Sequence, residues 1–207
     1  MPEGWTTVAK EASATFTDRK STFIAEVKPV TTEEQALAFL EQVKKKTADA
    51  RHHCYAYILN ENQTVRFSDD GEPHGTAGMP MLSLLRKEGL SDVVLVVTRY
   101  FGGILLGTGG LVRAYTESSR LALEQAGRQQ VETLVRCRVV CPYADYAKIE
   151  SVLSSFRVRK EEQTFESDVT TVFLLPAPDE EKASRALTEA TNGRIALQAE
   201  EQLYGVL

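Results

Sequence analysis

The hydrophobic pattern of this chain is clearest at its centre. Residues 93–98 read Val-Val-Leu-Val-Val-Thr, an apolar run with no polar alternation. Such a run predicts a strand that is covered on both faces. Arg99 and Tyr100 stand where this strand would end, and a glycine-rich loop at 101–110 leads into a helical pattern. Because Thr108 precedes the helical pattern, we expect Thr108 to be the N-cap of the helix.

Before this centre, alternating apolar and polar residues predict strands, and two helical patterns lie among them. The predicted strands are residues 5–14, 21–28, 51–59 and 64–67. A polar turn is expected at 60–63. One helix is expected from residue 31, where Thr-Thr-Glu-Glu has the character of a capping box, to residue 46, and a short helix is expected from Thr76.

After the central helix, six elements are predicted in the order βαββαβ. The strands are residues 132–140, 157–165, 169–175 and 196–203, and the helices are residues 143–156 and 179–191. This order is that of the ferredoxin-like, split βαβ motif. We therefore predict an α+β protein of two domains, with an N-terminal domain at 1–128 and a ferredoxin-like domain at 129–207.

Composition and charge narrow the class of protein. Hydrophobic residues make up 43% of the chain and charged residues 26%, which is typical of a soluble globular protein. The net charge of −5 argues against binding nucleic acid through bulk positive charge, so a nucleic-acid surface must be a local patch. Three cysteines, no signal-peptide pattern and no apolar run long enough to span a membrane predict a cytoplasmic protein without a membrane partner.

The glycine-rich loop is the first candidate for chemistry. It lacks the Walker A lysine, since Thr108 stands in that place, and Val112 breaks the Rossmann fingerprint. A strand, a flexible loop and a helix N-terminus can still present backbone N–H groups to one phosphate of a nucleotide or of an RNA backbone. The alternative is that the glycines only permit a tight turn with positive φ. The candidate phosphate- or nucleic-acid-binding residues are Arg99, Tyr100, Gly102, Gly103, Gly107, Gly109, Gly110 and Arg113.

The acidic loop of Asp69, Asp70 and Glu72 is the second candidate. Three carboxylates around a glycine could hold Mg²⁺, but their spacing does not match an EF-hand. A solvated turn is one alternative reading of this loop. Structural ion pairs with Arg99 or Arg113 are another.

The adjacent residues His52, His53 and Cys54 suggest a metal site at first sight. Neighbours on a strand point to opposite faces, so His52 and His53 cannot chelate one ion together. We interpret Cys54 as a small core residue. No residue stands out as a nucleophile or base, so we predict no catalytic residue, no metal and no cofactor.

Several long motifs resemble those of the IMPACT/YigZ family. The resemblance covers roughly residues 18–126, and the predicted C-terminal domain is similar to the small second domain of the bacterial members. The motifs are residues 68–73 (Ser-Asp-Asp-Gly-Glu-Pro), 75–78 (Gly-Thr-Ala-Gly), 97–103 (Val-Thr-Arg-Tyr-Phe-Gly-Gly) and 109–115 (Gly-Gly-Leu-Val-Arg-Ala-Tyr), with His52-x-Cys54-x-Ala56-Tyr57.

The resemblance implies an N-terminal α/β sandwich with the fold of domain IV of elongation factor G, and a C-terminal domain similar to that factor's domain V. Both of those domains work against ribosomal RNA. On this basis we expect a translation-linked regulatory or binding protein that docks on structured RNA or the ribosome through the central strand, loop and helix. Two alternatives stay open: a Mg²⁺-dependent enzyme acting on a phosphorylated metabolite or nucleotide, and a purely structural cluster in a protein that works through protein partners.

Overall fold

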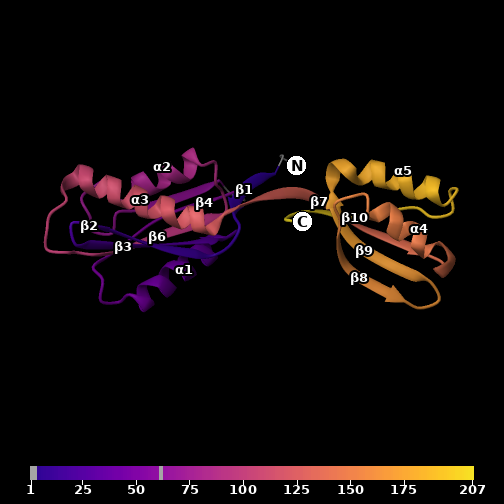
Figure 1. Cartoon of the computed structure of the whole chain (residues 1–207), viewed down its shortest axis with the longest axis horizontal. Helices are drawn as coiled ribbons and strands as arrows, with labels where there is room; N and C mark the ends of the chain where they lie inside the picture. Colours follow the sequence, from indigo (N-terminus) through magenta and orange to yellow (C-terminus); the bar gives the residue numbers. More distant parts are fainter. Residues whose placement is uncertain (1–3, 61–62) are drawn as a thin grey trace. The chain divides into compact units, whose positions relative to one another are not determined.

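The computed structural model describes residues 4–60 and 63–207. Within them the chain forms two compact units, Trp5–Gln130 (the N-terminal unit) and Val131–Leu207 with Gly4 (the C-terminal unit). The strand β7 (Arg128–Cys141) begins in the first unit and continues in the second, so the boundary predicted after residue 128 falls within this strand. Figure 1 shows each unit as a sheet with helices packed on it.

The N-terminal unit is built on one five-stranded antiparallel sheet. In spatial order its strands are β2 (Ala12–Asp18), β3 (Ser21–Pro29), β6 (Val93–Tyr100), β4 (His52–Leu59) and β5 (Thr64–Ser68). The helix α1 (Glu33–Lys46) covers one face, while α2 (Gly78–Lys87) and α3 (Gly107–Ala126) cover the other (Figure 1). The turn expected at 60–63 includes residues 61–62, which lie outside the described residues.

The central strand β6 accounts for the apolar run in the sequence. Val93, Leu95 and Val97 pack with α2 and α3, whereas Val94 and Val96 pack with α1. The side chains of all these residues are completely buried. Because helices cover the strand on both sides, it has no solvent face, and the prediction made from the absence of polar alternation is confirmed.

The single strand predicted at residues 5–14 is wrong. The chain forms β1 (Trp5–Val8), bends, and only then begins β2. β1 is anchored to the segment that precedes β6, where the N–H of Ser91 donates to the carbonyl of Thr6 at 3.0 Å. Ala9, Lys10 and Glu11 between the two strands are all exposed, so the alternation of buried and exposed side chains is interrupted there.

The C-terminal unit has the predicted βαββαβ order. After β7 its elements are α4 (Tyr143–Leu153), β8 (Arg159–Phe165), β9 (Val169–Pro176), a short 3₁₀ turn η1 (Ala177–Asp179), α5 (Glu180–Ala190) and β10 (Gln198–Gly205). The strands pair antiparallel in the order β10-β7-β9-β8. One face of this sheet, including Cys137 and Phe173, packs with Ile149 of α4 and Leu187 of α5. The mixed α+β, two-unit architecture is therefore as predicted.

Candidate functional site

Arg99 at the end of β6 and Glu72 in the acidic loop form a buried ion pair. Arg99 Nη1 donates to Glu72 Oε1 at 2.6 Å and to Oε2 at 2.9 Å, and the two side chains are only 7% and 3% exposed. The hydroxyl of Tyr115 on α3 donates to the same Oε1 at 2.8 Å. A structural ion pair, one of the alternatives drawn from the sequence, therefore exists, and it joins Arg99 to Glu72.

The same guanidinium group connects the core to the glycine-rich loop. The Arg99 guanidinium carbon lies 5.5 Å from the ring centroids of both Phe23 and Phe101. Its Nε is buried and has no hydrogen-bond partner among the described residues. Arg99 is thus held by a carboxylate and two aromatic rings, so it is not a free surface cation as the sequence suggested.

Asp69 closes the acidic loop onto the start of α2. Its carboxylate accepts hydrogen bonds from the backbone N–H groups of Gly75, Ala77 and Gly78, at 2.8, 3.0 and 2.8 Å. Burial raises the pKa of this carboxyl group, but these bonds and nearby His74 lower it by more, so the net pKa lies below its ordinary value. Asp69 therefore acts as a structural acceptor for the first N–H groups of a helix that has no other side-chain cap.

The three carboxylates of the acidic loop do not converge on one point. Asp70 Oδ2 accepts from the N–H of His53 at 2.7 Å, while Asp69 faces α2 and Glu72 faces Arg99. Across residues 4–60 and 63–207, no three His, Cys, Asp or Glu side chains gather in a way that could hold a metal ion. Each carboxylate already has a protein partner, so the loop supports the structural reading over Mg²⁺ binding.

His52, His53 and Cys54 separate across β4 as predicted. His52 Nδ1 bonds the carbonyl of Asp70 at 2.8 Å, whereas His53 Nε2 lies 2.9 Å from the hydroxyl of Thr47 at the end of α1. The Cys54 thiol is buried and donates to the carbonyl of Asp69 at 3.0 Å. Burial raises the pKa of this thiol far above its ordinary value, so it stays protonated at neutral pH and is not a nucleophile.

The glycine-rich loop is a close-packed turn with an exposed apolar tip. The N–H of Gly102 donates to Ser21 Oγ at 3.1 Å, and a Cβ on Gly102 would lie 2.0 Å from the carbonyl carbon of Lys20. Gly103 and Gly107 have φ of +83° and +73°. The tight-turn alternative therefore accounts for these three glycines. Three large apolar side chains of this loop are open to solvent: Phe101 is 54%, Ile104 43% and Leu105 81% exposed.

The prediction that Thr108 caps α3 is wrong. The helix begins at Gly107 and its N-cap is Leu106, which makes no side-chain capping bond. Gly107 has a positive φ, which glycine adopts more readily than other residues, and α3 begins at this residue. Thr108 therefore lies within the first turn of the helix. Gly109 and Gly110 follow in that turn, which contains no acidic residue. Gly107, Thr108 and Gly109 are exposed, so the start of this turn faces solvent.

Arg113 on α3 is exposed and has no ion pair among the described residues. Glu117 lies four residues further along α3, the spacing at which side chains of a helix can pair. Glu117 instead binds Arg120 at 2.7 Å, and Arg120 also binds Glu124. Arg120 therefore binds the carboxylates of both Glu117 and Glu124. Arg113 is left available to bind an anion from outside the protein. Tyr100, in contrast, donates its hydroxyl to Asp49 at 2.9 Å.

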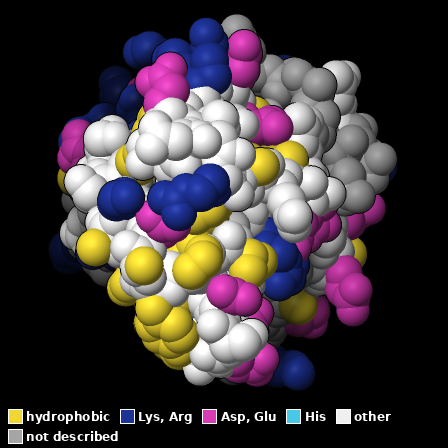
Figure 2. Space-filling view, turned by 90° about the vertical axis from the view of Figure 1, so that its right-hand side faces the viewer, with side chains coloured by type: hydrophobic (Ala, Val, Ile, Leu, Met, Phe, Trp, Pro, Cys, Tyr) yellow, Lys and Arg dark blue, Asp and Glu magenta, His cyan; other side chains and the backbone are white. Residues whose placement is uncertain are grey.

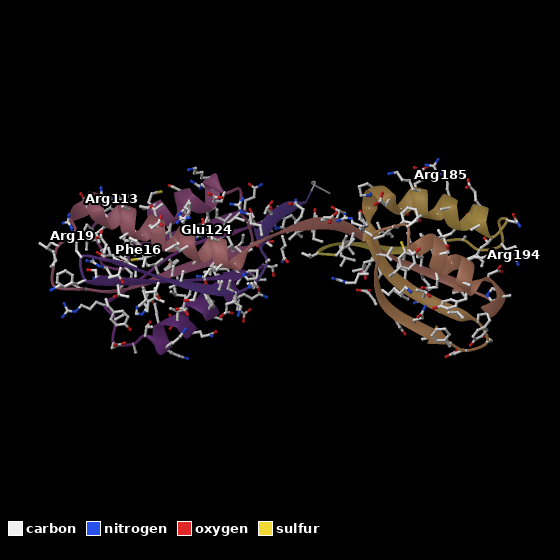
Figure 3. The ribbon with its side chains drawn as sticks, viewed as in Figure 1. Phe16, Arg19, Arg113, Glu124, Arg185 and Arg194 are labelled. Carbon is white, nitrogen blue, oxygen red and sulfur yellow. The ribbon has the colours of Figure 1, made fainter. Side chains whose placement is uncertain are left out.

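Further cations, which were not among the predicted binding residues, lie at the end of the sheet where β6 reaches Arg99 and Tyr100. Lys20 is in the turn that touches Gly102, and Thr22 pairs with Tyr100. Arg51 directly precedes His52, which pairs with Arg99. Figure 3 shows Arg19 and Arg113 at this same end of the unit. Arg19, Lys20, Arg51 and Arg113 are exposed and form no ion pair with another described residue; together with Phe101, Ile104 and Leu105 we call them the basic end.

The C-terminal unit offers no comparable surface. From Val131 to Leu207, where every residue is described, each lysine and arginine lies in an ion pair. Arg136 and Arg138, for example, bind Glu161 and Glu200 at 2.9 and 2.6 Å. Figure 2 shows basic, acidic and hydrophobic side chains interspersed on one end of this unit. Exposed cations without a protein partner are thus a feature of the N-terminal unit within the described part of the chain.

Comparison with known proteins gives both units a family. The model of the Impact N-terminal domain matches residues 19–123, and that of a domain of unknown function, DUF1949, matches residues 139–194. The chain is 36% identical to IMPACT family member YvyE of Bacillus subtilis, over 99% of this chain and 94% of that protein. It is also 36% identical to IMPACT family member YigZ of Escherichia coli, over 97% and 100%. This protein therefore belongs to the IMPACT family, and the resemblance seen in its motifs is confirmed.

Two further comparisons cover part of the chain and nearly all of it. Mouse Protein IMPACT is 41% identical over 44% of this chain and 30% of its own length. A crystal structure described as that of a hypothetical protein matches 97% of this chain and 99% of its own, with a TM-score of 0.63 and 36% identity. Among the described residues, no helix combines the length and apolarity that a membrane span requires.

Proposed function

We propose that this protein is a cytoplasmic, translation-linked regulatory protein that docks on structured RNA or the ribosome through the basic end. The observation that carries the proposal is the gathering of unpaired cations beside an exposed aromatic ring. The chain as a whole has a net charge of −5, so these cations are a local patch on an acidic protein. A local patch of this kind binds phosphates without attracting nucleic acid to the whole surface.

The roles of the residues follow from their exposure. Arg19, Lys20, Arg51 and Arg113 would contact phosphates, and the open first turn of α3 would add backbone N–H groups. Phe101 would stack on an unpaired base. Arg99 would position Phe101 from below and would not itself touch a phosphate, because Glu72 already binds it.

The proposal includes the likeness to elongation factor G that the motifs implied. The N-terminal unit would correspond to domain IV of that factor and the C-terminal unit to domain V. Support comes from the family membership and from the βαββαβ order of the second unit. The enzyme alternative is not carried forward, because each carboxylate of the acidic loop is bound to the protein and Cys54 is a buried thiol.

Co-sedimentation with ribosomes tests the proposal. The wild type, the double variant Arg19→Ala/Arg113→Ala and the control Lys182→Ala/Arg185→Ala would be compared at low and moderate salt. Lys182 and Arg185 are exposed cations of the C-terminal unit, so the control loses the same two positive charges without touching the basic end. We expect salt-sensitive association that the double variant loses and the control keeps. Equal association of all three proteins, or none at any salt, would contradict docking through the basic end.

A further inference from the structure

β2 is an edge strand whose outer side has no partner in the sheet. Among the described strands β3 is its only neighbour, and the two strands pair without interruption from Ala12 opposite Val27 to Asp18 opposite Ser21. The two residues that join them, Arg19 and Lys20, have φ of +44° and +66°, as in a type I′ two-residue hairpin. In such a hairpin the closing pair is hydrogen-bonded, and bonded and non-bonded pairs then alternate along the strands.

That alternation fixes which backbone groups of β2 point outward. Counting back from Asp18, the residues Thr17, Thr15 and Ser13 occupy the non-bonded positions. Their N–H and C=O groups therefore point away from β3, toward the open edge. Their side chains are exposed as well, and α1, on the same side of the sheet as these side chains, packs on β4 and β6. A further strand has free access to this edge.

The edge strands β8 and β10 of the C-terminal sheet carry features that usually prevent strand addition, whereas β5, the other edge of the N-terminal sheet, has one charged residue, Arg66. β8 contains four consecutive charged residues, Arg159 to Glu162, and a bulge between Lys160 and Glu162. β10 has a bulge between Ala199 and Glu201. Charges and bulges of this kind are how proteins protect their edges. β2 reads Ala-Ser-Ala-Thr-Phe-Thr-Asp; its single charge, Asp18, is at its end, and it has no proline and no bulge.

We propose that β2 pairs antiparallel with β2 of a second copy of this chain, about a two-fold axis at Thr15. Outward-pointing residues must pair with outward-pointing residues, and this register is the one that overlaps the whole strand. It sets Thr15 opposite Thr15, Ser13 opposite Thr17, and Ala14 opposite Phe16. Phe16 is half-buried against Phe23, so the methyl group of Ala14 from the other copy would cover its remaining edge.

The ends of the strand support the same register. Glu11, which pairs with Lys28 of its own chain at 3.0 Å, would lie opposite Arg19 of the second copy, so opposite charges would meet on both sides of the axis. Lys10 would then face Lys20, and this like-charge pair limits the pairing to the residues between. About six backbone hydrogen bonds over one short strand make a small interface. A weak, concentration-dependent dimer is therefore expected.

Sedimentation velocity of the full chain tests this proposal from about 10 μM to about 1 mM. The wild type should rise from its monomer mass of 22.9 kDa toward twice that value. Thr15→Pro removes an N–H that β3 does not use, so the sheet should survive while the dissociation constant rises at least about tenfold. Thr15→Val keeps the N–H and should associate like the wild type. Circular dichroism would show that both variants are folded.

A charge exchange tests the register independently. Arg19→Glu places two glutamates opposite each other and should weaken the dimer, and the double variant Glu11→Lys/Arg19→Glu should restore it. A monomer at every concentration would overturn the proposal, even if this edge then binds an extended segment of another protein. A dimer that Thr15→Pro and the charge exchange leave unchanged would overturn it too, because the contact would lie elsewhere.

Discussion

Arg99 and Glu72 share one buried environment, with Arg99 Nη1 2.6 Å from Glu72 Oε1 and neither side chain open to solvent. The pair links the strand β6 to the acidic loop, and the hydroxyl of Tyr115 ties it to α3. Arg99 and Glu72, which both belong to the family motifs, thus connect three elements inside the N-terminal unit. The exposed cations of the basic end stand outside these connections.

Removing one member of this pair should be strongly destabilising. Glu72→Gln leaves the guanidinium of Arg99 buried without a countercharge, and we expect a loss of about 3 kcal/mol or more in the free energy of unfolding. The measurement is urea unfolding followed by fluorescence of Trp5, the only tryptophan of the chain, which lies in the N-terminal unit. The control Glu117→Gln, on the surface of α3, should change the midpoint little. A Glu72→Gln protein as stable as the wild type would refute the structural role.

The pKa of Asp69 makes part of the stability depend on pH. Because its pKa is lower in the folded protein, this carboxylate contributes stability above the unfolded pKa of about 4, and that contribution is lost as the pH falls through the folded pKa. The variant Asp69→Asn should be less stable than the wild type at pH 7, and the difference should shrink on acidification. Unfolding midpoints from pH 7 to about pH 2 check this, with Asp168→Asn in an exposed turn as the control. If the stability difference between the wild type and Asp69→Asn were the same at every pH, the ionised carboxylate of Asp69 would not be what stabilises the loop.

Two glycines of the loop should respond in opposite ways to the same substitution. Gly102→Ala drives a methyl group into the backbone of Lys20, and we expect a loss of at least about 2 kcal/mol. Gly109→Ala meets nothing and replaces a flexible residue in a helix, so it should stabilise by up to about 1 kcal/mol. Thermal unfolding of both variants checks the pair. Equal effects would mean that the close approach of Gly102 to the β2–β3 turn is not maintained in solution.

Phe101 should matter for RNA binding more than for folding. Phe101→Leu keeps an apolar side chain of similar size but loses the flat ring, and base stacking contributes about 1–3 kcal/mol per base. We therefore expect weaker binding of a labelled single-stranded RNA in fluorescence anisotropy, with an unfolding midpoint close to that of the wild type. Phe165→Leu, at a phenylalanine of the C-terminal unit that is also 54% exposed, is the control and should bind like the wild type. Equal affinity of the Phe101→Leu and wild-type proteins would remove stacking from the proposed function.

Local patterns in the sequence were enough for most elements and for the family. The unbroken apolar run of β6, the βαββαβ order of the second unit and the separation of His52 from His53 all follow from the period of side chains along one strand or helix. The motif at 97–103 identified the family because it is long and specific. Where an element depends on its partners, the local pattern failed, as at the bend between β1 and β2 and at the start of α3.

Whether a charged side chain is buried and paired or exposed could be seen only in the folded sheet. Arg99 and Arg113 look alike in the sequence, yet one is buried against Glu72 and the other is exposed without a partner. Arg19 and Arg51 gave no signal, because only the strand order β2-β3-β6-β4 brings a hairpin turn and the start of β4 to the end of β6. Burial and pairing are set by contacts between residues far apart in the chain. The periodicity of side chains along the chain does not depend on those contacts. It therefore predicted the elements and the fold class, but not which cations lie outside ion pairs.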